Sequence, residues 1–134
     1  MEKTDVQLQT PTALAFIGDA AMSLFVRKLI VSRGGATLHI ASSRYVNATS
    51  QAAVFDELAI RGVFTQEESE IARRAKNAHL HSRAKAASLS EYHKATALEA
   101  VIGYLELKGD AERRDEILSM CVDIVDSNNC KGNT

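Results

Sequence analysis

The sequence contains a single proline, Pro11, no tryptophan, and only 5% aromatic residues. Proline ends or kinks helices, whereas runs of aromatic and β-branched residues favour strands. A chain of 134 residues that is poor in all of these and rich in alanine and leucine is typical of an all-α protein. Since 46% of the residues are hydrophobic, the composition also excludes a chain that is disordered throughout.

The chain also has only two cysteines, almost no net charge and no long apolar run. The two cysteines, Cys121 and Cys130, form no CxxC pair, which excludes a disulfide scaffold and a cysteine zinc site. With 16 basic and 17 acidic residues the net charge is −1, so the chain is not a strongly basic, histone-like protein. No apolar run reaches the ~20 residues of a membrane span, and the N-terminus resembles no signal peptide. We therefore expect a cytoplasmic protein with reduced thiols and no membrane contact.

Capping residues and glycines divide the chain into helical segments. Thr10 and Pro11 are typical of a helix start, and Gly34 and Gly35 of a helix end. Two capping boxes, beginning at Thr65 and Ser88, mark further starts. Together with the apolar periodicity, these signals predict helices over about 11–33, 37–43, 47–62, 66–77, 89–108 and 111–125, with a loop at 78–87.

The predicted organisation is one all-α domain over residues 1–134, with five to seven helices. Its core spans about 10–126, and the polar ends, 1–9 and 127–134, are expected to fray.

Two carboxylates stand out because they lie in apolar helical segments. Asp19 and Ser23 are the polar side chains between Ala13 and Val26, and Glu99 is the one charged residue between 95 and 105. An ionised carboxylate on an apolar surface is costly unless it is paired or bound to a metal.

Each carboxylate also has a glycine nearby. Gly18 precedes Asp19, and Gly103 lies one turn after Glu99. Glycine weakens a helix interior, so the two glycines indicate a structural need. Because they have no side chains, they predict a tight helix crossing at which Asp19 and Glu99 meet. A hard divalent cation such as Mg²⁺ would relieve their repulsion. The alternative is that each is an ordinary hydrogen-bonded polar residue at a helix junction.

The near-zero net charge hides one basic segment within an otherwise acidic chain. Residues 71–90 include no acidic residue and carry a charge of +5, which leaves −6 for the rest of the chain. The basic residues are Arg73, Arg74, Lys76, Arg83 and Lys85. Such a cluster suits contacts with phosphates, and the alternative is a solvated loop without a partner.

Several separated blocks resemble a known family. The segments 14–20 (LAFIGDA) and 98–105 (LEAVIGYL) are similar to the two motifs of the ribonuclease III catalytic domain. The segments 44–48 (RYVNA), 74–78 (RAKNA) and 92–97 (YHKATA) resemble blocks of its short Mini-III branch, which has no double-stranded-RNA-binding domain. The resemblance covers about residues 10–120.

This resemblance implies an α-helical homodimer that cleaves double-stranded RNA with Mg²⁺. Asp19 and Glu99 match the two central catalytic carboxylates and metal ligands, Gly18 and Gly103 the close-packing residues, and Phe16 a dimer contact. The chain departs from full-length ribonuclease III at two further acidic positions, where it has Ala15 and Thr96. These departures agree with the Mini-III branch and leave the number of metal ions open.

The resemblance further implies a biological role. The expected substrate is precursor 23S ribosomal RNA, cut on both strands to leave 5′-phosphate and 3′-hydroxyl ends, with a ribosomal protein as a helper. The five basic residues would contact the phosphates. Two alternatives remain: a non-catalytic RNA-binding relative that lacks the two acids, and a helical interaction module.

Overall fold

The structure, a computed structural model, describes residues 2–35, 37–78 and 88–132. Its helices within these residues are α1 (Lys3–Gln7), α2 (Pro11–Arg33), α3 (Leu38–Val46), α4 (Ala48–Ile60), α5 (Gln66–Lys76), α6 (Leu89–Lys108) and α7 (Ala111–Gly132). The all-α class is confirmed, and the helix count in the described residues agrees with the prediction. Of the predicted loop at 78–87, residues 79–87 lie outside the described residues.

The predicted helix starts form through local hydrogen bonds. The Thr10 hydroxyl accepts from the backbone N–H of Ala13, and both capping boxes close, between Thr65 and Glu68 and between Ser88 and Glu91. Gly34 and Gly109 follow the last turns of α2 and α6 with φ of 78° and 84°, which glycine adopts without strain. The helix starts that carry these caps therefore follow from the sequence, whereas α1 was not predicted and α7 continues beyond its predicted end at 125.

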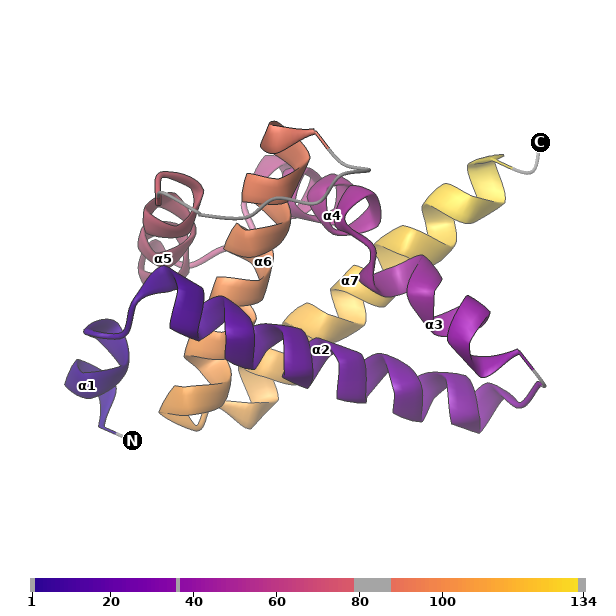
Figure 1. Ribbon diagram of the computed structural model, residues 1–134, viewed down its shortest axis with the longest axis horizontal. Coiled ribbons are helices and arrows are strands. Elements are labelled where there is room, and N and C mark those ends of the chain that lie inside the picture. The colour runs from indigo at the N-terminus through magenta and orange to yellow at the C-terminus, as the bar shows by residue number, and fades with distance from the viewer. Residues whose placement is uncertain (1, 36, 79–87, 133–134) are drawn as a thin grey trace.

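Helix α6 is the centre of the fold. It packs against α1, α2, α4, α5 and α7, and its residues from 100 to 105 are all buried. Long α2 lies across α6, with α5 and α4 on one side of the molecule and α7 behind the crossing (Figure 1). Because the middle of α6 is packed between other helices, its residues there are buried, and Glu99 is half-buried among them.

The ends of the chain differ from the expectation of frayed termini. The side chain of Val6 on α1 is fully buried, and α7 extends to Gly132. Arg33, at the end of α2, donates hydrogen bonds to Tyr45 on α3 and to Asp126 on α7, and the Tyr45 hydroxyl donates to Asp126. These contacts join three helices.

Among the described helices, no segment combines the length and apolar character that a membrane span requires.

Candidate active site

The crossing of α2 and α6 is built on two glycines. A Cβ atom added to Gly18 would lie 1.7 Å from the backbone oxygen of Glu99, and one added to Gly103 would lie 1.8 Å from that of Leu14. Real Cβ atoms do not approach this closely, so any other residue would push the two helices apart. The glycines therefore bring the backbones of the two segments into direct contact, at the turns that carry Asp19 and Glu99.

At this crossing the two carboxylates are neighbours. Asp19 is exposed, whereas Glu99 is half-buried. Burial, followed by the charge of Asp19 and a hydrogen bond to it, raises the pKa of Glu99 from its ordinary 4.5 to about 8, and a hydrogen bond from Gln51 opposes this rise. Without a cation, Glu99 therefore holds its proton to a higher pH than an ordinary glutamate does.

This donor set fits a divalent cation. Two carboxylates provide the hard oxygen ligands that Mg²⁺ prefers, and solvent access at Asp19 leaves room for the waters that Mg²⁺ retains. The residues that replace the two further acids add no ligand. Ala15 has no polar atom, and the hydroxyl of buried Thr96 donates to the Tyr92 carbonyl at 2.9 Å. Within the described part of the chain, no group of three or more His, Cys, Asp or Glu side chains forms a larger cluster.

A third polar residue of the site, Gln51 on α4, was not among the predicted site residues. Its side chain is 3% exposed, its Nε2 donates to the sulfur of Met22 at 3.1 Å, and it lowers the pKa of the Glu99 carboxyl. The sequence holds a signal for it, because Gln51 falls on the same helical face as the apolar Ala52, Phe55 and Leu58. A glutamine at an inward position is a departure from the pattern that the structure explains.

The basic residues that the structure describes all contact other parts of the chain. Arg73 pairs with Glu70 at 2.6 Å, and the Lys76 ammonium lies 5.6 Å from the centre of the Phe55 ring. Arg74 donates to the backbone oxygens of Gln7 and Gln9, both at 3.1 Å.

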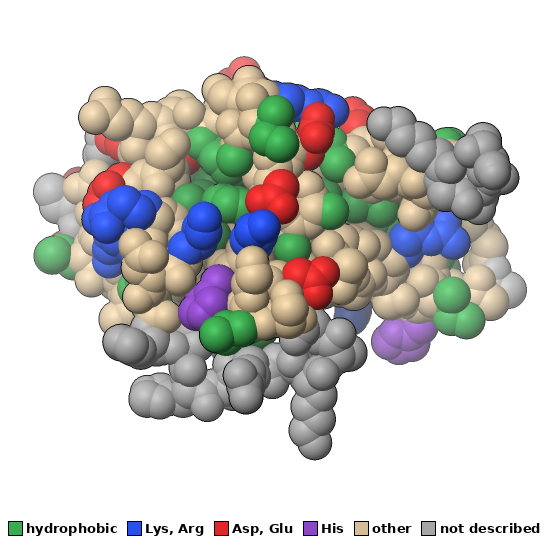
Figure 2. Space-filling view, turned by 90° about the horizontal axis from the view of Figure 1, so that it is seen from above, with side chains coloured by type: hydrophobic (Ala, Val, Ile, Leu, Met, Phe, Trp, Pro, Cys, Tyr) green, Lys and Arg blue, Asp and Glu red, His purple; other side chains and the backbone are tan. Residues whose placement is uncertain are grey.

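Arg74 therefore ties α5 to the segment around α1, while Arg73 and Lys76 remain exposed to solvent. Arg83 and Lys85 lie outside the described residues. The Lys and Arg side chains in Figure 2 form a broken row with acidic side chains among them, so the face shown there is mixed in charge.

Phe16 lies on the outer face of α2, where 78% of its surface is exposed. Leu24 and Val31 are also exposed on this helix and share the same side of it at helical spacing. Beside Leu24, a hollow of about 520 Å³ opens between α2, α6 and α7.

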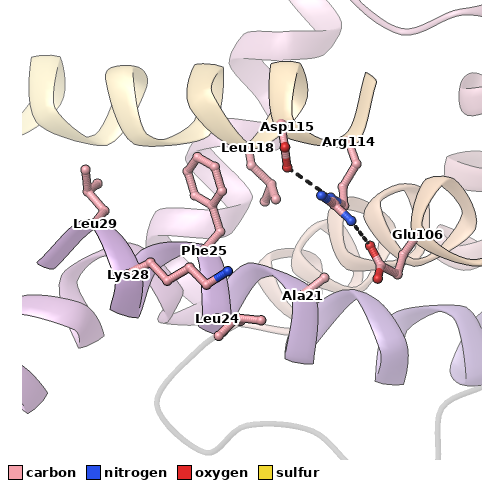
Figure 3. A pocket seen from close by; sticks show the side chains of 9 residues that line it. All are labelled: Ala21, Leu24, Phe25, Lys28, Leu29, Glu106, Arg114, Asp115 and Leu118. Atoms are coloured by element: carbon pink, nitrogen blue, oxygen red, sulfur yellow. Dashed lines mark hydrogen bonds and ion pairs between the residues drawn. The ribbon is translucent and has the colours of Figure 1, made fainter. Parts of the chain in front are cut away.

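Figure 3 shows Leu24 and Phe25 at the hollow, with Arg114 bridging Glu106 and Asp115 on its far side. This hollow is separate from the carboxylate pair. It extends the apolar outer face of α2.

Comparison with known proteins adds independent information. A family model described as the ribonuclease III domain matches residues 12–110, which run from the first turn of α2 to the end of α6 and include both carboxylates. The chain belongs to the ribonuclease III family. It is an endoribonuclease of the ribonuclease III type, with RNA as its substrate and a divalent metal ion as the cofactor that the family indicates.

The similar proteins within this family are of the short kind. The Mini-ribonuclease 3 of Symbiobacterium thermophilum is 40% identical over 87% of this chain and 90% of its own length. That of Staphylococcus aureus is 38% identical over 90% of this chain and 92% of its own length. A crystal structure of a Fusobacterium nucleatum protein has a TM-score of 0.78 at 30% identity, covering 89% of this chain and 96% of that one. These findings confirm the resemblance to the Mini-III branch of the ribonuclease III family.

Proposed function

We propose that this chain is a Mg²⁺-dependent endoribonuclease that cuts double-stranded RNA, with Asp19 and Glu99 as its catalytic, metal-binding residues. The observation that carries the proposal is the meeting of these two carboxylates at the glycine crossing, where burial and mutual repulsion raise the pKa of Glu99 to about 8. Such a pair binds a proton or a cation in preference to holding two bare charges.

The roles of the two side chains follow from their surroundings. Asp19 is exposed and accessible to a phosphate of the substrate, whereas Glu99 is held within the helix packing and must release its proton before it binds a cation. Gly18 and Gly103 keep the two helix backbones in contact, so the distance between the carboxylates is determined by the fold. When bound, the divalent cation supplies positive charge to the scissile phosphate and an activated water.

The proposed assembly is a homodimer formed through α2. The outer face of this helix exposes three large apolar side chains, Phe16, Leu24 and Val31. Burying them against a second copy would remove this apolar surface from water. Asp19 is also exposed on α2, so pairing through the outer face would place two active sites on one assembly. Two such sites cutting opposite strands would produce a staggered break with 5′-phosphate and 3′-hydroxyl ends.

Basic side chains are proposed to hold the RNA. Arg73 and Lys76 are the exposed described members of the basic group, and Arg83 and Lys85 follow in the sequence. Binding through phosphates reads the A-form shape of duplex RNA more than its sequence. Changing both Arg83 and Lys85 to glutamate should weaken RNA binding and its salt dependence without a change in helicity, and an unchanged affinity would make the loop a solvated surface.

The proposed biological substrate is precursor 23S ribosomal RNA in the cytoplasm, with a ribosomal protein as helper. The support for this is the similarity to Mini-ribonuclease 3 proteins over nine-tenths of the chain. The deciding experiment incubates the purified chain with long duplex RNA and with precursor ribosomal RNA, with and without Mg²⁺. Cleavage that requires Mg²⁺ is the expected result.

Asp19→Asn is the matched variant for this experiment. It should abolish cleavage while leaving helicity and dimerisation intact, because Asp19 is exposed and supports no packing. Undiminished cleavage by this variant would refute the proposed site. A wild-type chain that binds duplex RNA but leaves it uncut in Mg²⁺ and in Mn²⁺ would favour the non-catalytic alternative. That alternative is motivated by Ala15 and Thr96, which stand where full-length ribonuclease III enzymes have acids.

A further inference from the structure

A groove lies between α4 and α5, away from the carboxylate pair. Both helices pack against α6, and the space left between them is a hollow of about 260 Å³. Its floor is apolar and consists of Phe55 and Ala59 on α4, Phe64 between the helices, and Ala72 on α5. The Phe55 and Phe64 rings lie 5.5 Å apart, while Ala59 is exposed and Phe64 half-buried. The groove therefore presents an apolar, partly aromatic surface to solvent.

The rim of this groove is basic and polar. Four residues of α5 and its C-terminal end form it, namely Ser69, Arg73, Lys76 and Asn77. Among the described residues that line the groove, none is acidic. Arg73 is paired with Glu70, but both side chains are more than half exposed, at 61% and 56%, so this pair contributes little and Arg73 can exchange it for a phosphate. The Lys76 ammonium lies over the floor, 5.6 Å from the centre of the Phe55 ring. The rim therefore favours an anionic ligand.

The size of the groove limits what fills it. Drug-sized ligands occupy pockets of about 300–1,000 Å³, and a partner helix needs a longer apolar groove for its anchors on successive turns. A hollow of about 260 Å³ lies below this range and is suited to one small ring system. The ligand that fits is thus small, flat and apolar, and it carries a negative charge toward the rim.

A single unpaired nucleotide has this combination of properties. In a duplex the bases are stacked and paired, so a paired strand offers its phosphates to Arg73 and Lys76 but nothing to the apolar floor. A nucleotide that leaves the duplex adds a flat base beside the same phosphates, and such bases stack on aromatic side chains. The side-chain amide of Asn77 at the rim has both donors and an acceptor for the edge of the base. Floor and rim together therefore match a nucleotide better than a paired strand.

We propose that the groove between α4 and α5 binds one unpaired nucleotide of the substrate RNA, with its base on Ala59 and Phe64 and its phosphate on Arg73 and Lys76. The inference rests on the proposed function, because it assigns the two basic side chains to RNA. It also narrows the substrate class to duplex RNA that is interrupted by a bulge or an internal loop. Stacking of one base on an aromatic side chain raises the affinity about fivefold or more.

The test compares two RNAs that differ by one base. Both are duplexes with a single bulged nucleotide, and in one of them this nucleotide is abasic, so the backbone and its charge are the same. Fluorescence anisotropy in a chelator measures binding without cleavage, over a series in which the bulge moves along one strand. At a matching position of the bulge, the wild-type chain should bind the RNA with the base about fivefold more tightly than the abasic RNA.

Ala59→Leu and Ala53→Leu are matched variants on α4. Both alanines are exposed, and Ala59 lines the groove whereas Ala53 does not. Leucine at position 59 fills the groove without an aromatic face, so the variant should bind the two RNAs with equal affinity. Ala53→Leu should keep the wild-type preference. Phe64→Leu keeps apolar packing but removes the flat ring, and it should lower the preference as well. Circular dichroism and thermal melts establish that each variant is folded.

The remaining results also decide. If Ala59→Leu prefers the base as strongly as Ala53→Leu does, the inference is overturned. A wild-type chain without this preference at any position of the bulge also overturns it, and the proposed function stands if fully paired duplex RNA is bound and cut. If Ala59→Leu does not fold, Phe64→Leu decides by the same comparison. A wild-type chain that binds no duplex RNA at low salt refutes the proposed function itself.

Other occupants of the groove would be recognised by further measurements. A fall in the mass of the chain in Ala59→Leu but not in Ala53→Leu, measured by light scattering, would assign the groove to a second copy. A short peptide of aspartate and phenylalanine that binds to the wild type but not to Ala59→Leu, without any effect of the bulged base on RNA binding, would assign it to a protein segment. Either result overturns the inference.

Discussion

The Cα of Gly18 on α2 lies against the backbone carbonyl of Glu99 on α6, so closely that a methyl group there would lie 1.7 Å from the carbonyl oxygen. The same crossing holds Gly103 against the Leu14 carbonyl. Since Asp19 follows Gly18 directly, this contact makes the two carboxylates neighbours although 80 residues separate them in sequence. Stability and chemistry therefore depend on the same few atoms.

Gly18→Ala should destabilise the chain strongly. The added methyl meets backbone and not a flexible side chain, so the helices must separate and the packing around α6 is lost, at a cost of about 3 kcal/mol or more. Chemical denaturation of the two proteins measures the difference. Ala53→Ser, which adds one atom at an exposed position of α4, is the control and should be neutral. A free energy of unfolding for Gly18→Ala equal to that of wild type would contradict the close contact.

The stability of the cation-free chain should fall as pH rises from about 4.5 to about 8. Glu99 has its pKa raised to about 8 in the folded chain and 4.5 as its ordinary value, so in this window the folded state holds a proton that the unfolded state has released. Stability is then lost with increasing pH until Glu99 is ionised in both states.

Thermal melts in a chelator test this dependence, with a decrease in Tm of about 3 °C or more expected across the window. Glu99→Gln removes the titrating group, so the decrease attributable to it should vanish. Adding Mn²⁺ at the upper end of the window should restore the Tm of the wild type, because the cation replaces the proton. A Glu99→Gln variant with the same pH dependence as wild type would disprove the assignment.

Phe16→Asp should convert a dimer into a monomer. The aspartate places a charge in the centre of the apolar outer face of α2, where Phe16 is 78% exposed in the single chain. Sedimentation or light scattering at micromolar concentration measures the mass. Ile60→Asp is the control, since Ile60 is 81% exposed on α4 and lies off this face. Loss of the dimer in both variants, or in neither, would argue against an interface through α2.

Adjacent arginines on α5 should behave differently. Arg74→Met removes two hydrogen bonds from a guanidinium to the carbonyls of Gln7 and Gln9, and should cost about 2 kcal/mol of stability because α5 is no longer tied to the segment around α1. Arg73 pairs with exposed Glu70, and Arg73→Met should leave stability nearly unchanged while weakening RNA binding. Melts and RNA titrations on the same two variants measure both effects. Equal melting temperatures would show that Arg74 does not anchor α1.

Much of the fold is readable from local signals. Thr10 with Pro11, and the two capping boxes at Thr65 and Ser88, act within one helical turn, so their hydrogen bonds do not depend on the rest of the chain. The helix predicted over 111–125 ends seven residues too early, since α7 continues to Gly132. The structure places the helix predicted over 37–43 at Leu38–Val46. No capping side chain marks its start, and Tyr45 extends its end through contacts with Arg33 and Asp126.

The candidate site likewise has some features that the sequence shows and others that only helix packing creates. Asp19, Glu99 and their glycines are visible in the sequence because charge and glycine are anomalies within apolar helices. The hydrogen bond from Gln51 to Met22 and the anchoring role of Arg74 are not, since each depends on a partner that lies 29 or more residues away. Contacts of this kind arise from how helices pack, and a single sequence shows no trace of the partner.

The residues alone thus decide where the helices begin and end, that the chain is all-α, and which two acids are misplaced in apolar surroundings, because these properties depend on neighbours within a turn or two. Tertiary structure decides that the pKa of Glu99 is raised beside Asp19, that Gln51 on α4 donates to Met22 on α2, and that Arg74 ties α5 to the chain around α1. These are properties of burial and of distances between helices, which exist once α2, α4 and α5 are packed against α6.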